Sequence, residues 1–227
     1  KKECISKVQF LSNEILNKVC KKTSSQIKIF AVIGASEESI ILMLSSLFLA
    51  SHHCICFEDL SEEAILKRIE IFKPDIVLFR KSTETKVKKL IPRYLNGLLP
   101  FLKIDFSRGN LSINQKLIHK NFKNNENSNL FTLFTSGSTG LPKAVIHGVR
   151  GYLSYAKYTT EYFFGLKKGS TIFAATDAGW INGHTYAFYG PLLLGATSVI
   201  NENPMFLATP KLLGKIFQSF NPDCFYT

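Results

Sequence analysis

Apolar residues recur along the first half of the chain with spacings that alternate between strand and helix. The predicted strands cover residues 27–33, 54–57 and 75–79, and the predicted helices cover residues 3–22, the segment from the polar turn at 34–38 to about residue 50, and the segment from Ser61 to just before Pro74. The strands are short and rich in branched residues, whereas the helices carry an apolar face. Such an alternation favours a parallel sheet with helices packed on its faces.

The same alternation resumes after a polar, asparagine-rich stretch at residues 107–129, which is typical of a surface loop or a soft boundary. The predicted strands then cover residues 130–134, 144–147, 171–175, 197–200 and 224–227, and the predicted helices cover residues 151–164, 184–194 and 210–220. We therefore predict an α/β fold with mostly parallel sheets flanked by helices, in a first portion over residues 1–129 and a second over residues 130–227.

Composition excludes two classes of protein. Hydrophobic residues make up 45% of the 227 residues, which is too many for a chain that is disordered over most of its length. The most apolar run, Ile40–Ala50, is too short to span a bilayer, and the charged N-terminal residues have no apolar signal core behind them. We expect a cytoplasmic protein with no membrane partner.

Basic residues outnumber acidic ones, with 28 Lys and Arg against 17 Asp and Glu and a net charge of +11. A nucleic-acid partner is one interpretation of this balance. The lysines are scattered, however, and they accompany many asparagines without a DNA-binding or RNA-binding signature. We interpret the charge as a compositional bias and expect no nucleic-acid partner.

Five cysteines without a C-x-x-C pair suit a reducing compartment. The cluster of His52, His53, Cys54 and Cys56 invites a metal site, but its spacing matches no common zinc pattern and no second ligand pair follows. A buried strand start is the better interpretation, so we expect no bound metal at these residues.

The segment from Thr135 to Lys143, TSGSTGLPK, carries the strongest chemical signal in the chain. Its glycines let backbone N–H groups approach an anion, its hydroxyls add hydrogen-bond donors, and its lysine supplies a positive charge. This chemistry suits a polyphosphate. Because Leu141 and Pro142 separate Gly140 from Lys143, the segment is not a Walker A loop, and the alternative is a plain turn rich in serine and glycine.

The string TSGSTGLPKAV resembles the phosphate-binding motif of the AMP-forming, adenylate-forming enzymes, which include acyl-CoA synthetases, adenylation domains and luciferases. A second string at residues 176–197, TDAGWINGHTYAFYGPLLLGAT, is similar to the acetyl-CoA and propionyl-CoA synthetase branch, and GYLSYA at residues 151–156 also fits that branch. One departure is Thr132, where the family usually has a large apolar residue. The resemblance implies the fold of the N-terminal subdomains of such an enzyme.

The resemblance also implies a two-step ligase reaction on a small carboxylate. The carboxylate attacks the α-phosphate of ATP, which is bound with Mg²⁺, to give an acyl-adenylate and pyrophosphate, and coenzyme A then takes the acyl group. The catalytic residues would be Lys143, Ser138 and Thr139. The residues that bind the ATP phosphates would be Thr135, Ser136, Gly137, Ser138, Thr139, Gly140 and Lys143.

By the same resemblance, an acyl pocket comprises a branched side chain, an amide, a glycine and two wall residues, which are Ile181, Asn182, Gly183, Trp180 and His184. Taken alone, Trp180 equally suits a core aromatic, and His184 suits a buried histidine with satisfied hydrogen bonds. Asp177 is expected to cap a turn rather than to take part in the chemistry.

The coenzyme A half of the resemblance differs from the branch. Two glycines usually follow the strand phenylalanine, whereas Glu58 and Asp59 follow Phe57 here, and acidic side chains repel a phosphorylated cofactor. The basic residues nearest to the family's nucleotide-binding positions are Lys86, Lys88 and Lys89. An adenylating enzyme with a different acyl acceptor is therefore an alternative.

Members of this family are more than twice as long as the chain, so the resemblance implies that the C-terminal domain, with its adenylation lysine, is absent from it. We expect the 227-residue chain to be inactive alone and the full-length enzyme to be active. The alternative is a degenerate, non-catalytic homologue that keeps the fold and binds nucleotide.

Overall fold

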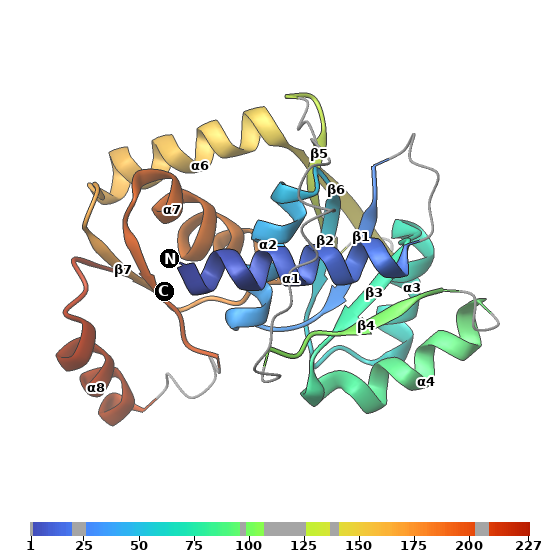
Figure 1. Cartoon of the computed structure of the whole chain (residues 1–227). Helices are drawn as coiled ribbons and strands as arrows, with labels where there is room; N and C mark the ends of the chain where they lie inside the picture. The colour runs from blue at the N-terminus through green and yellow to red at the C-terminus, as the bar shows by residue number, and fades with distance from the viewer. Residues whose placement is uncertain (1, 20–25, 96–98, 107–125, 137–140, 203–208) are drawn as a thin grey trace. The chain divides into compact units, whose positions relative to one another are not determined.

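The computed structural model describes residues 2–19, 26–95, 99–106, 126–136, 141–202 and 209–227. They form two compact units (Figure 1). The first unit comprises Lys1–Ile33 and Glu37–Val149, and the second comprises Gly34–Ser36 and Arg150–Thr227. The division predicted at residue 129 differs from this one, because the two strands that follow residue 128 complete the sheet of the first unit.

A six-stranded sheet forms the centre of the first unit, with strand order β4-β3-β1-β2-β5-β6. The strands are β1 (Lys28–Val32), β2 (His52–Cys56), β3 (Ile76–Phe79), β4 (Phe101–Lys103), β5 (Asn129–Ser136) and β6 (Pro142–Gly148). The first five strands pair in parallel, whereas β6 runs antiparallel to β5. The mostly parallel sheet predicted from the sequence is confirmed, and its last strand departs from parallel pairing.

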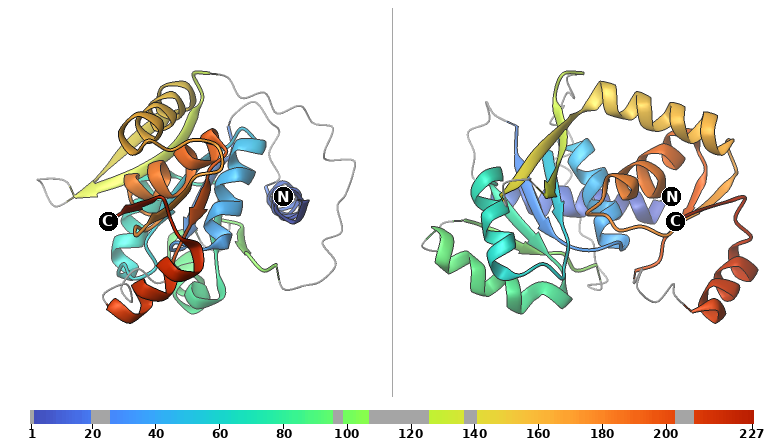
Figure 2. Two further views of the ribbon diagram at one scale, coloured as in Figure 1. Left: turned by 90° about the vertical axis from the view of Figure 1, so that its left-hand side faces the viewer. Right: turned by 180° about the vertical axis from the view of Figure 1, so that it is seen from behind.

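Helices cover both faces of this sheet. They are α1 (Lys2–Lys18), α2 (Glu37–Phe48), α3 (Glu62–Phe72) and α4 (Glu84–Leu95). α1 lies beside α2 on one face, and α3 contacts α4 on the other (Figure 1, Figure 2). Right-handed crossover connections explain this division, because the chain moves one way along the sheet from β1 to β2 and the opposite way from β2 to β3 and on to β4.

α3 shows how the local sequence sets the limits of a helix. Ser61 caps its N-terminus, with the side-chain hydroxyl accepting a hydrogen bond from the Ala64 N–H at 3.2 Å, and two glutamates fill the first turn. The helix ends at Phe72, its C-cap residue Lys73 adopts the left-handed conformation with φ of 54°, and Pro74 follows. The helix predicted between Ser61 and Pro74 is confirmed.

An apolar core lies between one face of the sheet and the helices α3 and α4. Its buried members are Phe30, Val32, Cys54, Cys56, Ile65, Ile69, Phe72, Val77, Phe79, Val87, Leu90 and Leu99. Alternate residues of β1, β2 and β3 contribute to it, as the pleat of a strand requires. Burying each large apolar side chain stabilises the fold by about 1.5–3 kcal/mol. Two of these residues, Val87 and Leu90, belong to α4, an element that the sequence pattern did not predict.

The second unit contains a three-stranded parallel sheet with strand order β8-β7-β9. Its strands are β7 (Thr171–Ala174), β8 (Thr197–Val199) and β9 (Cys224–Tyr226), and its helical elements are α6 (Val149–Phe164), the π-helix η2 (Gly183–Tyr189), α7 (Gly190–Leu194) and α8 (Pro210–Phe220). The single helix predicted over residues 184–194 is therefore two elements. The π-helix ends at Tyr189 and the α-helix begins at Gly190. Pro191, in the first turn of the α-helix, has no N–H to donate.

The two histidines of β2 are enclosed in the first unit. His52 Nε2 lies 2.7 Å from Thr132 Oγ1, and His53 Nδ1 lies 3.0 Å from Ser46 Oγ. His53 also stacks on Phe131, its partner in the sheet. The predicted buried strand start is confirmed. Among the described residues, no three His, Cys, Asp or Glu side chains gather as metal ligands do.

The first prediction concerns the pH dependence of stability. Burial, reinforced by the Lys28 ammonium and partly offset by a backbone hydrogen bond at Phe131, lowers the pKa of His52 from 6.5 to about 4. Between these values the unfolded chain binds a proton at His52 and the folded protein does not. We predict that the free energy of unfolding falls as the pH drops from 6.5 towards 4, by up to about 1.4 kcal/mol per pH unit.

Urea denaturation at several pH values measures this slope, and the variant His52→Gln is the control because it removes the titrating ring. A smaller slope remains in the control, since burial also lowers the pKa of His147. Equal slopes in the wild type and in His52→Gln contradict the assignment.

Candidate active site

Two paired strands carry the ends of the phosphate-loop motif. β5 and β6 form an antiparallel hairpin in which Thr135 pairs with Lys143 and Ser136 pairs with Pro142. Both strands are longer than the sequence pattern indicated. The pairing brings the two ends of the motif together at one end of the hairpin. The residues that connect them, Gly137, Ser138, Thr139 and Gly140, lie outside the described residues.

The motif residues that the structure describes present their polar groups to solvent. Thr135, Ser136 and Lys143 are all exposed. Within the described part of the chain, the Lys143 ammonium has neither an ion-pair nor a hydrogen-bond partner, and the two hydroxyls also have none. These donors are therefore available to an anion without first breaking an internal bond.

A hollow of about 320 Å³ adjoins the hairpin on the side of α3. It is lined by Ser136, Pro142, Ser61, Ala64, Glu63, Lys67 and Arg68. Lys67 pairs with Glu63 at 2.8 Å, which leaves the Arg68 guanidinium as the unbalanced charge. Arg68 is held in place by the Phe134 ring, 5.6 Å away, and by its hydrogen bond to the Ala64 carbonyl at 2.7 Å. The surroundings of Ser136 are thus electropositive.

The acyl-pocket motif begins, in the second unit, with a tight turn organised by Asp177. One carboxylate oxygen accepts the Gly179 N–H at 2.7 Å, and the other accepts the Ala35 N–H at 3.2 Å. The Asp177 carbonyl accepts the Trp180 N–H at 3.1 Å. A Cβ on Gly183 would lie 2.0 Å from that same carbonyl oxygen, so only glycine fits there. The expected role of Asp177 in capping a turn is confirmed.

The five residues predicted for the acyl pocket differ strongly in burial. Trp180 is 61% exposed and Ile181 is 38% exposed, whereas Gly183 and His184 are buried. The exposure of Trp180 does not fit the alternative of a core aromatic. His184 does fit a satisfied buried histidine, because its Nδ1 lies 3.3 Å from the Trp180 carbonyl oxygen. Asn182 is half-buried, and its side chain makes no cap hydrogen bond to η2.

A side-chain contact behind this turn was not predicted from the sequence. The Tyr152 hydroxyl of α6 lies 2.6 Å from Thr185 Oγ1, and Thr185 Oγ1 donates to the Ile181 carbonyl at 2.8 Å. Burial raises the pKa of Tyr152 well above its ordinary value, so the hydroxyl keeps its proton. The residues are 33 positions apart along the chain, and no local pattern connects them.

Glu58, which stands where the synthetase branch usually has a glycine, has partners of its own. Its carboxylate accepts a hydrogen bond from Ser82 Oγ at 2.9 Å and lies 3.8 Å from the Arg80 guanidinium. Lys86 donates to the carbonyls of Glu58 and Leu60 at 2.6 and 3.0 Å. Arg80 therefore offsets part of the negative charge, while Lys86 holds the turn after β2 in place.

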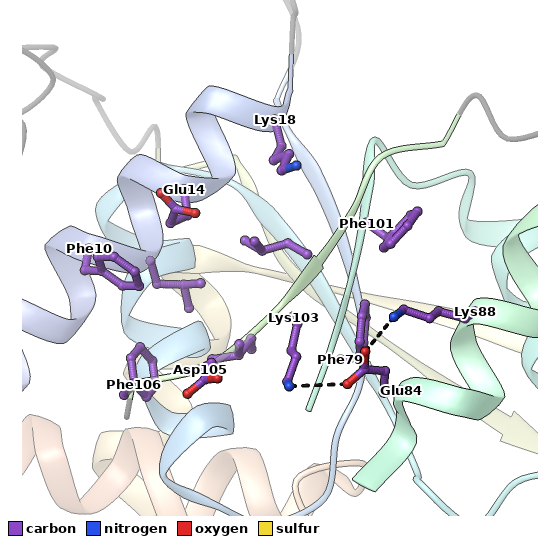
Figure 3. Close-up of a pocket in the computed structure, with 13 residues that line it drawn as sticks. Phe10, Glu14, Lys18, Phe79, Glu84, Lys88, Phe101, Lys103, Asp105 and Phe106 are labelled. Carbon is purple, nitrogen blue, oxygen red and sulfur yellow. Dashed lines mark hydrogen bonds and ion pairs between the residues drawn. The ribbon is translucent and has the colours of Figure 1, made fainter. Parts of the chain in front are cut away.

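A cavity of about 320 Å³ lies between α1 and β4, at the opposite edge of the sheet from β6 (Figure 3). An aromatic pair, Phe10 and Phe106, forms one wall, with ring centroids 6.5 Å apart. Glu84 pairs there with Lys88 at 2.6 Å and with Lys103 at 3.3 Å. The lining contains as many lysines as carboxylates, so it offers a polyphosphate no net attraction.

Similarity to known proteins extends over nearly the whole chain. The family described as AMP-binding enzyme matches residues 24–227. An acetyl-coenzyme A synthetase of Helicobacter acinonychis is 30% identical over 245 aligned positions, which cover 98% of this chain and 37% of that protein. An acetyl-coenzyme A synthetase of Shewanella amazonensis is 47% identical over 98 residues, which cover 43% of this chain and 15% of that protein.

The fold has a counterpart among solved structures as well. A crystal structure of an acyl-CoA synthetase from Brucella canis superposes with a TM-score of 0.75 at 16% identity, over 98% of this chain and 41% of that one. At such an identity the likeness concerns the fold alone. The chain spans 37% of the length of its Helicobacter acinonychis relative. Because the family match runs from residue 24 to residue 227, the chain belongs to the AMP-binding enzyme family.

Proposed function

We propose that the protein that carries this chain is an AMP-forming acyl-CoA synthetase of the acetyl-CoA synthetase type, and that it activates a small carboxylate. The supporting observation is the hairpin of β5 and β6, which presents Thr135, Ser136 and Lys143 without partners among the described residues. The similarity to acetyl-coenzyme A synthetases supports the same activity. The chain contributes the phosphate-binding loop and the acyl-pocket motif.

The first step joins the carboxylate to the α-phosphorus of ATP. A carboxylate oxygen bonds to phosphorus, the bond to the bridging oxygen of the β-phosphate breaks, and pyrophosphate leaves with that electron pair. Lys143 offsets the charge on the phosphate oxygens, and Ser136 donates a hydrogen bond, as Ser138 and Thr139 do by motif position.

The described residues of the hairpin fit a phosphate group, because they offer hydroxyl and ammonium donors rather than carboxylates. Mg²⁺, bound together with the nucleotide, supplies further neutralisation of the phosphate charge. The electropositive hollow beside Ser136 adds the Arg68 guanidinium to the same surroundings. The chain's own part in the first step is therefore to bind and orient the phosphates.

The acyl group of the substrate lies, in this proposal, against Ile181 and Asn182. The branched side chain of Ile181 narrows the space available and favours a short acyl chain. Trp180 forms an outer wall, as its exposure allows, and the buried His184 supports the turn from beneath through the Trp180 carbonyl. Gly183 allows the close approach to Asp177 that shapes the turn.

In the second step the thiol of coenzyme A gives up its proton and its sulfur bonds to the acyl carbon, while the bond from that carbon to the phosphate oxygen breaks and AMP leaves with the electron pair. A second candidate is an adenylating enzyme that transfers the acyl group to a less highly charged acceptor. The acidic pair Glu58 and Asp59 favours this candidate, as does the engagement of Lys86 by two backbone carbonyls. The ion pair of Glu58 with Arg80 favours coenzyme A, because it weakens the repulsion of a phosphorylated cofactor.

A cytoplasmic location belongs to the same proposal. Within the described part of the chain, Cys4, Cys54, Cys56 and Cys224 form no disulfide, as is usual in a reducing compartment. Among the described helices, none combines the length and apolar character that a membrane span needs.

Carboxylate-dependent exchange of labelled pyrophosphate into ATP tests the proposed function on the whole protein. Acetate or another short acid is expected to support exchange, and coenzyme A is expected to convert the adenylate to a thioester. The absence of exchange with every short acid contradicts the proposal. Exchange without any coenzyme A-dependent release of AMP favours the second candidate.

The second prediction concerns Lys143. The variant Lys143→Ala removes the positive charge at the phosphate hairpin, and we expect turnover in the whole protein to fall by a factor of about a hundred or more. Because Lys143 is exposed and has no partner among the described residues, its removal leaves the melting temperature unchanged. Lys157→Ala, at another exposed lysine, is the matched control. Wild-type turnover in Lys143→Ala reduces the motif to a plain turn.

The third prediction concerns Asn182, whose amide has no hydrogen-bond partner within the described residues. Once a substrate covers this half-buried amide, leaving the amide unpaired is unfavourable by about 1–3 kcal/mol, so a polar group on the substrate gains from meeting it. We expect a small hydroxy acid to be preferred over propionate, and Asn182→Thr to reduce that preference.

Specificity constants for acetate, propionate and a small hydroxy acid measure the effect of Asn182. Ratios of these constants within one variant cancel any general loss of activity. If Asn182→Thr leaves every ratio unchanged, the residue does not face the substrate. If fatty acids of about eight or more carbons are the best substrates, the assignment of Ile181 as a narrowing residue is wrong as well.

A further inference from the structure

The acyl-pocket turn comprises residues 177–183, and its exposed side chains receive little support from packing. Trp180 is 61% exposed and Ile181 is 38% exposed, so the core does not hold their side chains. The position of Ile181 therefore depends on hydrogen bonds to the backbone around it. On the N-terminal side the Asp177 carboxylate holds the Gly179 N–H, and on the C-terminal side Thr185 Oγ1 holds the Ile181 carbonyl.

The direction of the second set of bonds follows from the number of protons. The Thr185 hydroxyl has a single proton, which it donates to the Ile181 carbonyl at 2.8 Å. The oxygen of that hydroxyl, 2.6 Å from the Tyr152 hydroxyl, is therefore the acceptor, and Tyr152 is the donor. Tyr152, Thr185 and Ile181 form a relay from α6 to the turn. Its two hydroxyl-bearing side chains are buried, so water does not compete for these bonds.

The π-helix η2 connects this chain of hydrogen bonds to the backbone that follows Ile181. At the C-terminal end of η2, the Gly190 N–H bonds to the Thr185 carbonyl five residues earlier, so this last turn is wider than an α-helical turn. Thr185 is thus bonded through its backbone to Gly190, at the C-terminal end of η2, and through its side chain to Ile181. Gly190 also lies close to α6, because a Cβ built on it would be 2.0 Å from Thr160 Oγ1.

We propose that Tyr152 is a positioning residue that sets the carboxylate specificity of the acyl pocket, acting through Thr185 on the backbone of Ile181. This inference rests on the proposed function, which places Ile181 against the acyl group. Tyr152 touches neither substrate nor nucleotide in this account. Its effect is on the selectivity between acids of different size, and the binding of ATP is unaffected.

The test compares Tyr152→Phe with Tyr155→Phe in the whole protein. Both changes remove one hydroxyl from α6, but Tyr155 is 60% exposed and its hydroxyl has no partner among the described residues, which makes it the matched control. Phenylalanine at 152 keeps the edge-to-face packing on Tyr189, whose ring centroid is 6.0 Å away. The fold is therefore expected to survive the substitution.

Loss of one buried hydrogen bond is expected to change the ratio of specificity constants for acetate and propionate by about three- to tenfold in Tyr152→Phe. The KM for ATP stays at the wild-type value, and Tyr155→Phe changes neither quantity. Thr185→Ser, which keeps the hydroxyl, retains the wild-type ratio, whereas Thr185→Val loses it. A purely structural role for Tyr152 lowers the melting temperature without moving the ratio, and that result overturns the inference.

Hydrogen exchange separates a failure of this inference from a failure of the proposed function. If the wild type activates no short carboxylate, the specificity claim fails with the proposed function, and the relay is still tested by the exchange of the backbone amides at residues 179–185. Faster exchange there in Tyr152→Phe, and not in Tyr155→Phe, supports the relay. If the wild type activates short carboxylates while both variants keep its acid selectivity and its amide exchange, the relay inference is wrong and the proposed function stands.

Discussion

The attachment of β5 to β2 sets the position of the β5–β6 hairpin, at whose end we propose that the phosphates of ATP bind. The two strands pair in parallel at His53 and Phe131. A buried hydrogen bond between the side chains of the adjacent residues His52 and Thr132 also joins them. β5 continues from this attachment to Thr135 and Ser136, and its antiparallel pairing with β6 returns the chain to Lys143. Paired strands therefore place these three donors, and such fixed placement is the preorganisation that the proposed binding of phosphate needs.

The acyl-pocket turn is held by different physical means. Its residues are partly exposed, so hydrogen bonds and close backbone approach replace core packing. Asp177 ties the turn to the Gly34–Ser36 segment through Ala35, and Gly183 lies so close to the Asp177 carbonyl that no side chain fits. Because the turn depends on a few hydrogen bonds, the loss of one bond in the chain from Tyr152 through Thr185 is expected to move Ile181. This is the physical basis for the role proposed for Tyr152.

Elements with strong local patterns could be predicted from the sequence, and elements defined by distant contacts could not. The helix after Ser61 has a cap, acidic residues in its first turn and a terminating proline, and it begins and ends as predicted. α4 was missed because its apolar positions, such as Val87 and Leu90, stand among many lysines, and β4 was missed because it is only three residues long. Thr132 departs from the family pattern for a reason visible only in three dimensions, since its hydroxyl satisfies a histidine 80 positions away.

Hydrogen exchange measured on the whole protein can show whether the end of the β5–β6 hairpin binds the phosphates of ATP. We expect Mg²⁺-ATP to slow exchange in peptides that span residues 135–143, relative to the free protein and to Mg²⁺ alone. We expect no change in the peptides of α1 and β4 around the cavity at the opposite edge of the sheet. Protection confined to that cavity, with residues 135–143 exchanging as in the free protein, would rule out phosphate binding at the hairpin.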